Sequence, residues 1–158
     1  MASVVKTNAV RLLENAAISF TSYEYDVSDG EIDAQSIARK LNVEGDRVFK
    51  TLVAESPDKE HFVFVVPAVG SLNLKKAART AGVKSIAMIK QKELLPLTGY
   101  VHGGCSPVGM KKLFPTFIDE TAILFERIFV SGGKVGFNLE IAPEDLCGFV
   151  NGEFADLA

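Results

Sequence analysis

The sequence has few of the residues from which metal centres and covalent cross-links are built. Its 158 residues include two cysteines, two histidines and no tryptophan. Cys105 and Cys147 lie far apart, and because no secretory signal is present, reduced thiols are expected rather than a disulfide. The Cys and His residues show no zinc-like spacing. We therefore expect no structural metal and no cofactor.

Long apolar segments are absent as well. Hydrophobic residues make up 47% of the chain and charged residues 23%, and no stretch approaches the ~18 consecutive apolar residues that can span a bilayer. The first residues lack the basic segment, apolar run and cleavage site of a secretory signal. We expect a cytoplasmic protein without a membrane segment that forms a single domain over residues 1–158.

An excess of positive charge is also missing. The net charge is −3 and the pI is about 5.4, which excludes a broad basic surface that grips nucleic-acid backbones. Basic residues do gather in 73–84, 90–92 and 109–113, whereas acidic residues dominate 24–33 and 140–156. Any RNA contact must therefore be local, and the alternative for each basic cluster is an ordinary solvated helix.

Apolar periodicity, capping residues and turn residues predict the secondary structure. Thr7, Asp33 and Asn73 are suitable helix N-caps, and Gly82 is a suitable C-terminal stop. The expected helices cover 7–17, 34–41, 74–81, 90–97 and a final segment after 142. The expected strands cover 18–26, 47–55, 61–68, 85–89, a segment from 116, 126–130 and 135–141, the last two joined as a hairpin.

Strands outnumber helices, and several neighbouring strands look like hairpins rather than crossovers. We therefore expect an α+β fold with a mixed, mostly antiparallel, barrel-like sheet surrounded by helices. The pair 47–55 and 61–68 should be central. The segment 100–115 contains three glycines and two prolines, directly after Gly99, and is expected to be an irregular, functional loop.

Lys50 is a cation within an otherwise apolar strand. Alternation places it on one face with Val48 and Leu52, and Thr51 on the other face. A lysine is seldom buried without a partner, because desolvation of an ammonium group is costly. Lys50 therefore either serves a functional site or lies at a sheet edge and reaches water.

The stretch “GGCSPVG” at 103–109 is a second candidate. Paired glycines let backbone amides approach a carbonyl or phosphate oxygen closely, but a plain turn is an equal alternative. Cys105 is the candidate nucleophile in this loop, and His61 and His102 are the only histidines that could activate it. We treat such a Cys-His pair as a minority hypothesis. No paired acids and no Ser/His/Asp order suggest another catalytic set.

Three segments, in order and spacing, resemble the YbaK family of aminoacyl-tRNA deacylases, relatives of the editing domain inserted in bacterial-type prolyl-tRNA synthetases. They are “VFKTLV” (48–53), “GGCSPVGMKK” (103–112) and “VSGGK” with “LEIAPEDL” (130–146). The similarity covers nearly the whole chain and favours the Cys-tRNA(Pro) branch. It implies a barrel-like α+β fold and hydrolysis of cysteine from mischarged tRNA(Pro).

The resemblance also implies functional residues. The essential lysine of the family falls on Lys50, which we expect to bind and orient the aminoacyl-adenosine end. The positions implied to bind substrate are Tyr25, Thr51, Gly103, Gly104, Ser106, Pro107 and Ser131. This sequence departs from the family at Cys105, where an aliphatic residue is common, and at Ile32, which stands in the region of a pocket phenylalanine.

The implied reaction needs no protein nucleophile, since in the cysteinyl branch the thiol of the substrate is thought to attack the ester. The partners implied are mischarged aminoacyl-tRNA and prolyl-tRNA synthetase. One alternative is deacylation of Ala-tRNA(Pro) or another small aminoacyl-tRNA, because one methyl group changes selectivity by only about 1–3 kcal/mol. Another is a non-catalytic module that binds aminoacyl-tRNA or nucleotides.

Overall fold

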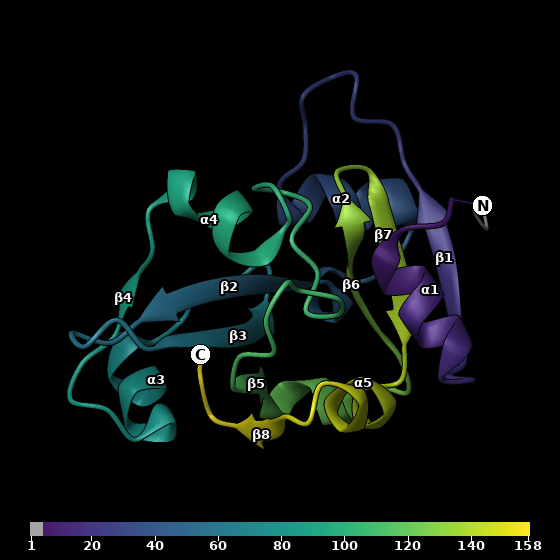
Figure 1. Ribbon diagram of the computed structural model, residues 1–158. Helices are drawn as coiled ribbons and strands as arrows, with labels where there is room; N and C mark the ends of the chain where they lie inside the picture. Colours follow the sequence, from purple (N-terminus) through teal and green to yellow (C-terminus); the bar gives the residue numbers. More distant parts are fainter. Residues whose placement is uncertain (1–4) are drawn as a thin grey trace.

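The computed structural model describes residues 5–158, which form helices and strands close to those predicted (Figure 1). The helices are α1 (Asn8–Asn15), α2 (Ala34–Leu41), α3 (Leu74–Ala81), α4 (Gln91–Thr98) and α5 (Pro143–Phe149), with short 3-10 helices at Gly45–Arg47 and Glu120–Leu124. The strands are β1 (Phe20–Glu24), β2 (Phe49–Glu55), β3 (His61–Pro67), β4 (Ala87–Met88), β5 (Thr116–Asp119), β6 (Ile128–Lys134), β7 (Phe137–Ile141) and β8 (Glu153–Ala155).

The strands are divided between two sheets. One has the order β1-β7-β6 and is antiparallel, and the other has the order β4-β2-β3-β5-β8. In the larger sheet, β5 pairs in parallel with β3 and with β8, whereas β2 pairs antiparallel with β3 and β4. The α+β class and the mixed, mostly antiparallel pairing are confirmed. The barrel-like sheet is not confirmed, because the strands form two sheets joined by an isolated bridge between Val48 and Phe129.

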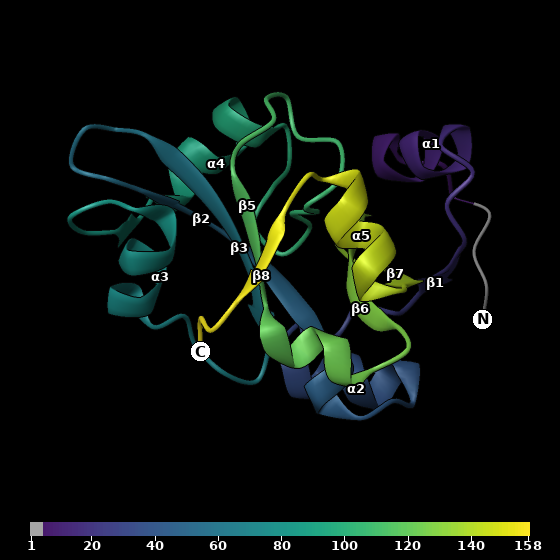
Figure 2. The same cartoon turned by 90° about the horizontal axis from the view of Figure 1, so that it is seen from below.

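Strand β3 lies at the centre of the larger sheet and is buried on both faces. Val63 and Val65 point into a core to which both sheets contribute, whereas Phe62 and Phe64 point to a second cluster beneath α3. Burial on both faces explains why this segment is a continuous apolar run rather than an alternating one. Figure 2 shows the larger sheet between α3 and the smaller sheet.

The predicted helix caps are present and fix the starts of three helices. The side chains of Thr7, Asp33 and Asn73 accept hydrogen bonds from backbone amides in the first turns of α1, α2 and α3. Gly82 ends α3 with φ 73°, a left-handed conformation that glycine adopts without strain. Asp33 matters most for function, because it sets where α2 begins beside the site described below.

The 99–115 segment between α4 and β5 contains no helix or strand, as expected. Strand β8 was missed, because three residues are too few to show an alternating pattern. Among the described residues no helix is long and apolar enough to cross a bilayer. Within the same part of the chain no three His, Cys, Asp or Glu side chains gather as a metal site.

Candidate functional site

A cavity of about 570 Å³ lies between β2, α2, α4, the 99–115 segment and the β6–β7 hairpin. Five of its lining residues are exposed and mark its mouth: Gly30, Ile32, Asp33, His102 and Gly103. A cavity of this size accepts a ligand of roughly drug-like dimensions. It can therefore hold the end of a larger molecule but not the whole of one.

Lys50 extends from β2 into the wall of this cavity. Its apolar surroundings are as predicted, since Val48 packs with Phe129 and Leu52 packs on the cluster beneath α3. The side chain is only half-buried, and its Nζ donates to the Gly70 carbonyl oxygen at 2.8 Å. Because an ammonium group carries three N–H donors, two remain for a ligand.

The edge of β2 beside Lys50 is not covered by β4, and the adjoining Val48 bridges to Phe129 of β6. Strand β4 pairs with β2 only at Ala54 and Glu55, so no β4 residue pairs with Lys50 or Thr51. The expectation that β2 is central therefore holds only for its second half. Lys50 thus lies in the cavity wall, at a part of β2 that does not pair with β4.

Two buried polar atoms of the wall have no hydrogen-bond partner within residues 5–158. They are Thr51 Oγ1 and Asn138 Oδ1. Most buried polar atoms in proteins are paired, and leaving one unpaired costs about 1–3 kcal/mol. Two such atoms in one cavity indicate positions where a ligand supplies hydrogen-bonding groups.

Strand pairing brings further polar groups to the same wall. Ser131 of β6 is directly opposite Asn138 of β7, and the Asn138 amide nitrogen lies 3.5 Å from the Tyr25 hydroxyl. Burial raises the pKa of Tyr25, so its phenol is neutral. The Ser131 Oγ accepts the Gly133 amide at 3.2 Å and keeps its own proton to donate.

The glycine loop reaches the cavity at Gly103 and Cys105. Gly103 has φ 85°, and the amide N–H groups of Gly103 and Cys105 donate no hydrogen bond to any described residue. Neither amide is therefore used within the described part of the chain. Ile32 also lines the cavity, 3.2 Å from where a Cβ on Gly103 would lie.

Gly104, Ser106 and Pro107 do not line the cavity but support the loop. A Cβ on Gly104 would lie 2.9 Å from the Val135 amide nitrogen, so only glycine lets the loop pack on the β6–β7 hairpin. Ser106 is fully buried, and its hydroxyl accepts the Val108 amide at 3.2 Å. Pro107 is buried beside it. The structure thus places five of the eight predicted residues in the lining of the cavity: Tyr25, Lys50, Thr51, Gly103 and Ser131. The other three pack behind the lining.

Cys105 is poorly suited to act as a nucleophile. Burial raises the pKa of its thiol to about 12, although a hydrogen bond with Thr98 opposes this shift. The reactive form of cysteine is the thiolate, which is scarce at neutral pH for such a group. The His61 Nε2 atom lies 3.5 Å from the Glu55 carboxylate. His102 lines the same cavity as Cys105, so the argument against Cys-His catalysis is the raised pKa of the thiol.

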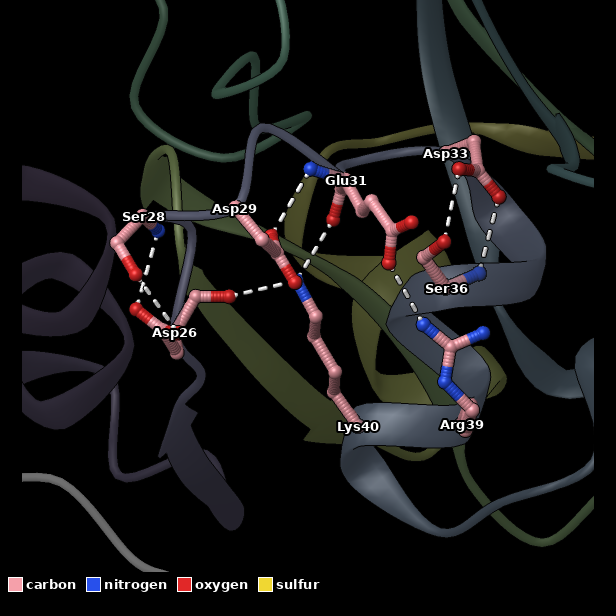
Figure 3. A network of polar contacts seen from close by, with 8 residues as sticks. All are labelled: Asp26, Ser28, Asp29, Glu31, Asp33, Ser36, Arg39 and Lys40. Carbon is pink, nitrogen blue, oxygen red and sulfur yellow. Dashed lines mark hydrogen bonds and ion pairs between the residues drawn. The ribbon is translucent and has the colours of Figure 1, made fainter.

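Another wall of the cavity is formed by the segment that follows β1 together with α2, which we call the acidic wall (residues 26–40). Figure 3 shows its polar network. The Lys40 ammonium donates to the carbonyl oxygens of Asp26 and Glu31 at 2.7 and 2.8 Å and to the Asp29 carboxylate at 2.8 Å. Its side chain is only 14% exposed. Lys40 therefore ties this segment to α2.

The other charges of the acidic wall are also used internally. Glu31 pairs with Arg39 at 2.9 Å, and the Asp33 carboxylate accepts both the amide and the hydroxyl of Ser36. The hydrogen bond from Lys40 lowers the pKa of Asp29, and that from the Ser36 amide lowers the pKa of Asp33. Both carboxylates are ionised at neutral pH and serve the wall itself.

The sequence agrees with one known family over most of its length. The model of the aminoacyl-tRNA editing domain matches residues 31–149. The chain belongs to the aminoacyl-tRNA editing domain family. This confirms the resemblance drawn from the three motifs, and all of the cavity residues discussed above except Tyr25 and Gly30 lie within the matched region.

Known relatives agree with this assignment. A protein of Enterococcus faecalis that carries the name Cys-tRNA(Pro)/Cys-tRNA(Cys) deacylase EbsC is 42% identical over 152 residues, which are 96% of this chain and 93% of that protein. A solved structure described as a trans-editing enzyme for prolyl-tRNA synthetase has a TM-score of 0.85 at 24% identity, covering 97% of this chain and 98% of the other. The hypothetical protein APE2540 has a TM-score of 0.87 at 20% identity, covering 96% and 99%. These structures show a shared fold.

Asn138 and Lys40 were missed by the sequence reasoning. Asn138 stands in an alternating strand, where an asparagine on the buried face is itself unusual, and this could have marked it. Lys40 gave no such signal, because a lysine in the last turn of a helix is ordinary. Its role is visible only once the 26–31 segment is seen folded back on α2.

Proposed function

We propose that this editing-domain protein removes cysteine from mischarged Cys-tRNA(Pro) as a free-standing, trans-acting deacylase in the cytoplasm. The observation that carries the proposal is the composition of the cavity, which offers a cation, free amides and unpaired neutral oxygens but no activated nucleophile. The name of the 42% identical relative supports the choice of substrate.

The ester that joins an amino acid to the tRNA ribose is already activated. Catalysis then requires positioning of the ester and stabilisation of negative charge on its carbonyl oxygen. We assign positioning of the aminoacyl-adenosine end to Lys50. The amides of Gly103 and Cys105 are the donors for the carbonyl oxygen. Thr51, Asn138, Ser131 and Tyr25 hold the polar groups of the amino acid.

The missing nucleophile is supplied by the substrate. The cysteinyl thiol loses its proton and its sulfur attacks the ester carbonyl carbon. The bond between this carbon and the ribose oxygen breaks, and the ribose oxygen takes up a proton to leave as the tRNA hydroxyl. Water then opens the cyclic thioester to give free cysteine. The protein residues orient the ester and stabilise the oxyanion, and none of them forms a covalent bond.

The proposal is tested with purified protein and tRNA(Pro) charged separately with cysteine, alanine, serine or proline. Faster loss of cysteine than of the other amino acids supports it. Serine is the sharpest control, because it replaces only the thiol sulfur by a less nucleophilic oxygen. Loss of alanine at the rate of cysteine would contradict substrate-assisted attack and favour a general deacylase of small amino acids.

A binding module without catalysis is the remaining outcome, and it would show RNA binding with every ester retained. The same assay with prolyl-tRNA synthetase tests the proposed partner. A stimulated rate at limiting enzyme concentration is expected if the two proteins act on tRNA(Pro) together, since a weakly acidic chain benefits from a partner that selects the tRNA.

A further inference from the structure

The two sides of the cavity mouth carry opposite charges that are used differently. On the acidic wall, Asp26, Asp29 and Glu31 are held in hydrogen bonds within the wall. The 99–115 segment and the β6–β7 hairpin, which line the cavity through Gly103 and Ser131, carry three exposed lysines, which we call the basic rim: Lys111, Lys112 and Lys134. None of the three forms an ion pair with any of residues 5–158.

The basic rim is one continuous part of the fold. Figure 1 shows the 99–115 segment between α4 and the β6–β7 hairpin. The Lys134 backbone lies 3.0 Å from the position of a Cβ on Gly104, and the Lys111 side chain crosses Gly99 at the end of α4. The Lys111 Nζ lies 3.4 Å from the Pro96 carbonyl oxygen, a long contact that leaves two N–H donors free.

On these grounds, and resting on the proposed function, we propose that the basic rim binds the phosphates of the tRNA acceptor stem. The cavity of about 570 Å³ holds only the aminoacyl end, so the rest of the RNA must leave over one side of the mouth. The net charge of −3 gives no general attraction to a polyanion, so the contact must be local. The acidic wall repels phosphates, and the basic rim attracts them.

With the acceptor stem bound to the basic rim, the RNA leaves the cavity over the glycine loop, past Gly103, and away from α2. Lysine contacts to phosphates carry affinity without sequence preference. The choice of tRNA(Pro) would then come from elsewhere, in agreement with a role for a partner. The basic rim therefore contributes binding of any acceptor stem, and the cavity contributes the choice of amino acid.

The test is a variant with Lys111→Gln, Lys112→Gln and Lys134→Gln. The matched control carries Lys75→Gln, Arg79→Gln and Lys84→Gln, which remove the same charge from exposed positions on or just after α3. Figure 1 shows α3 on the other side of the larger sheet from α4. Both variants are measured for melting temperature, for binding of a labelled acceptor-stem RNA at several salt concentrations, and for deacylation.

We expect the rim variant to bind the RNA at least about 10-fold more weakly and to lose about 2 from the slope of log affinity against log salt. The control variant should match the wild type. On Cys-tRNA(Pro) the rim variant should raise KM and leave kcat within about 3-fold. On a cysteinyl ester of adenosine alone, which lacks the stem, it should match the wild type.

Equal RNA affinity and an equal salt slope in the wild type and the rim variant would overturn the rim proposal, even if deacylation is observed. An equal loss in both variants would also overturn it, because the effect would then come from net charge. If the wild type hydrolyses no ester but binds RNA through the rim, the proposed function fails and the rim stands. The two proposals are therefore tested separately.

Discussion

Two lysines in different walls of the cavity show how differently one side chain can be used. Lys40 is largely buried and donates to three oxygens of the acidic wall. Lys50 is half-buried and donates to one backbone carbonyl. The ammonium of Lys40 is saturated and therefore gives the wall its shape. The ammonium of Lys50 retains two donors and is therefore available for a ligand.

The largest effect is expected from removal of Lys50, whose ammonium retains two free donors. Lys50→Ala should reduce kcat/KM for Cys-tRNA(Pro) by about 100-fold or more, because misplacement of a reacting group by about 1 Å typically has this magnitude. The melting temperature should change little, since the Nζ makes one contact and the strand is paired on its other side. Activity at the wild-type level in a folded Lys50→Ala protein would remove Lys50 from the site.

A second comparison is between unpaired and paired polar atoms. Thr51→Val and Asn138→Leu keep the approximate shape of the side chains and remove the unpaired oxygens, and Asn138→Leu also removes the 3.5 Å hydrogen bond to the Tyr25 hydroxyl. We expect unchanged or increased thermal stability, because each substitution removes a buried oxygen that has no hydrogen-bond partner and whose burial is costly. We expect kcat/KM to fall about 10- to 100-fold, because the ligand loses its acceptor. Loss of stability with normal activity would show that these atoms have a structural role.

Lys40, whose ammonium donates to three oxygens, should matter more for stability than for the chemical step. Lys40→Met should lower the free energy of unfolding by about 1–3 kcal/mol, since charged hydrogen bonds are lost. It should raise KM about 10-fold with a smaller change in kcat, because the displaced wall carries Ile32. Arg39→Met is the control, because its 64% exposed side chain forms a single ion pair, and it should change stability by less than about 0.5 kcal/mol.

The smallest effect on activity is expected at Cys105, which lines the cavity between the two sides. Cys105→Ser should keep activity within about 3-fold. A pKa of about 12 also predicts slow alkylation at pH 8, about 10²- to 10³-fold slower than for a free thiol. The raised pKa favours the folded state below the usual thiol pKa of 9.0, and this contribution is lost as pH rises towards 12. Rapid alkylation in a Cys147→Ser background, or inactivity of folded Cys105→Ser, would revive the nucleophile hypothesis.

The sequence was sufficient to locate the helices and the apolar strands, because caps and periodicity are local properties. It also placed Lys50, Thr51 and the glycine loop among the candidates. It could not predict that the strands divide into two sheets, since β3 pairs in parallel with β5, and β5 with β8, between segments that are distant in the sequence. Nor could it separate Gly103, which faces the cavity, from Gly104, which packs on the hairpin. That difference is made by a contact between segments about thirty residues apart.

The close approach of Gly104 to the backbone of Lys134 and Val135 has a consequence for motion. Two loops in backbone contact cannot slide independently, since close-packed atoms transmit displacement. The Gly103 amide on one loop and the Ser131 hydroxyl on the other are therefore expected to move as one rigid body. Fluctuations of the cavity would then change the distance between these two loops and the acidic wall, while the distance between the two donors stays constant.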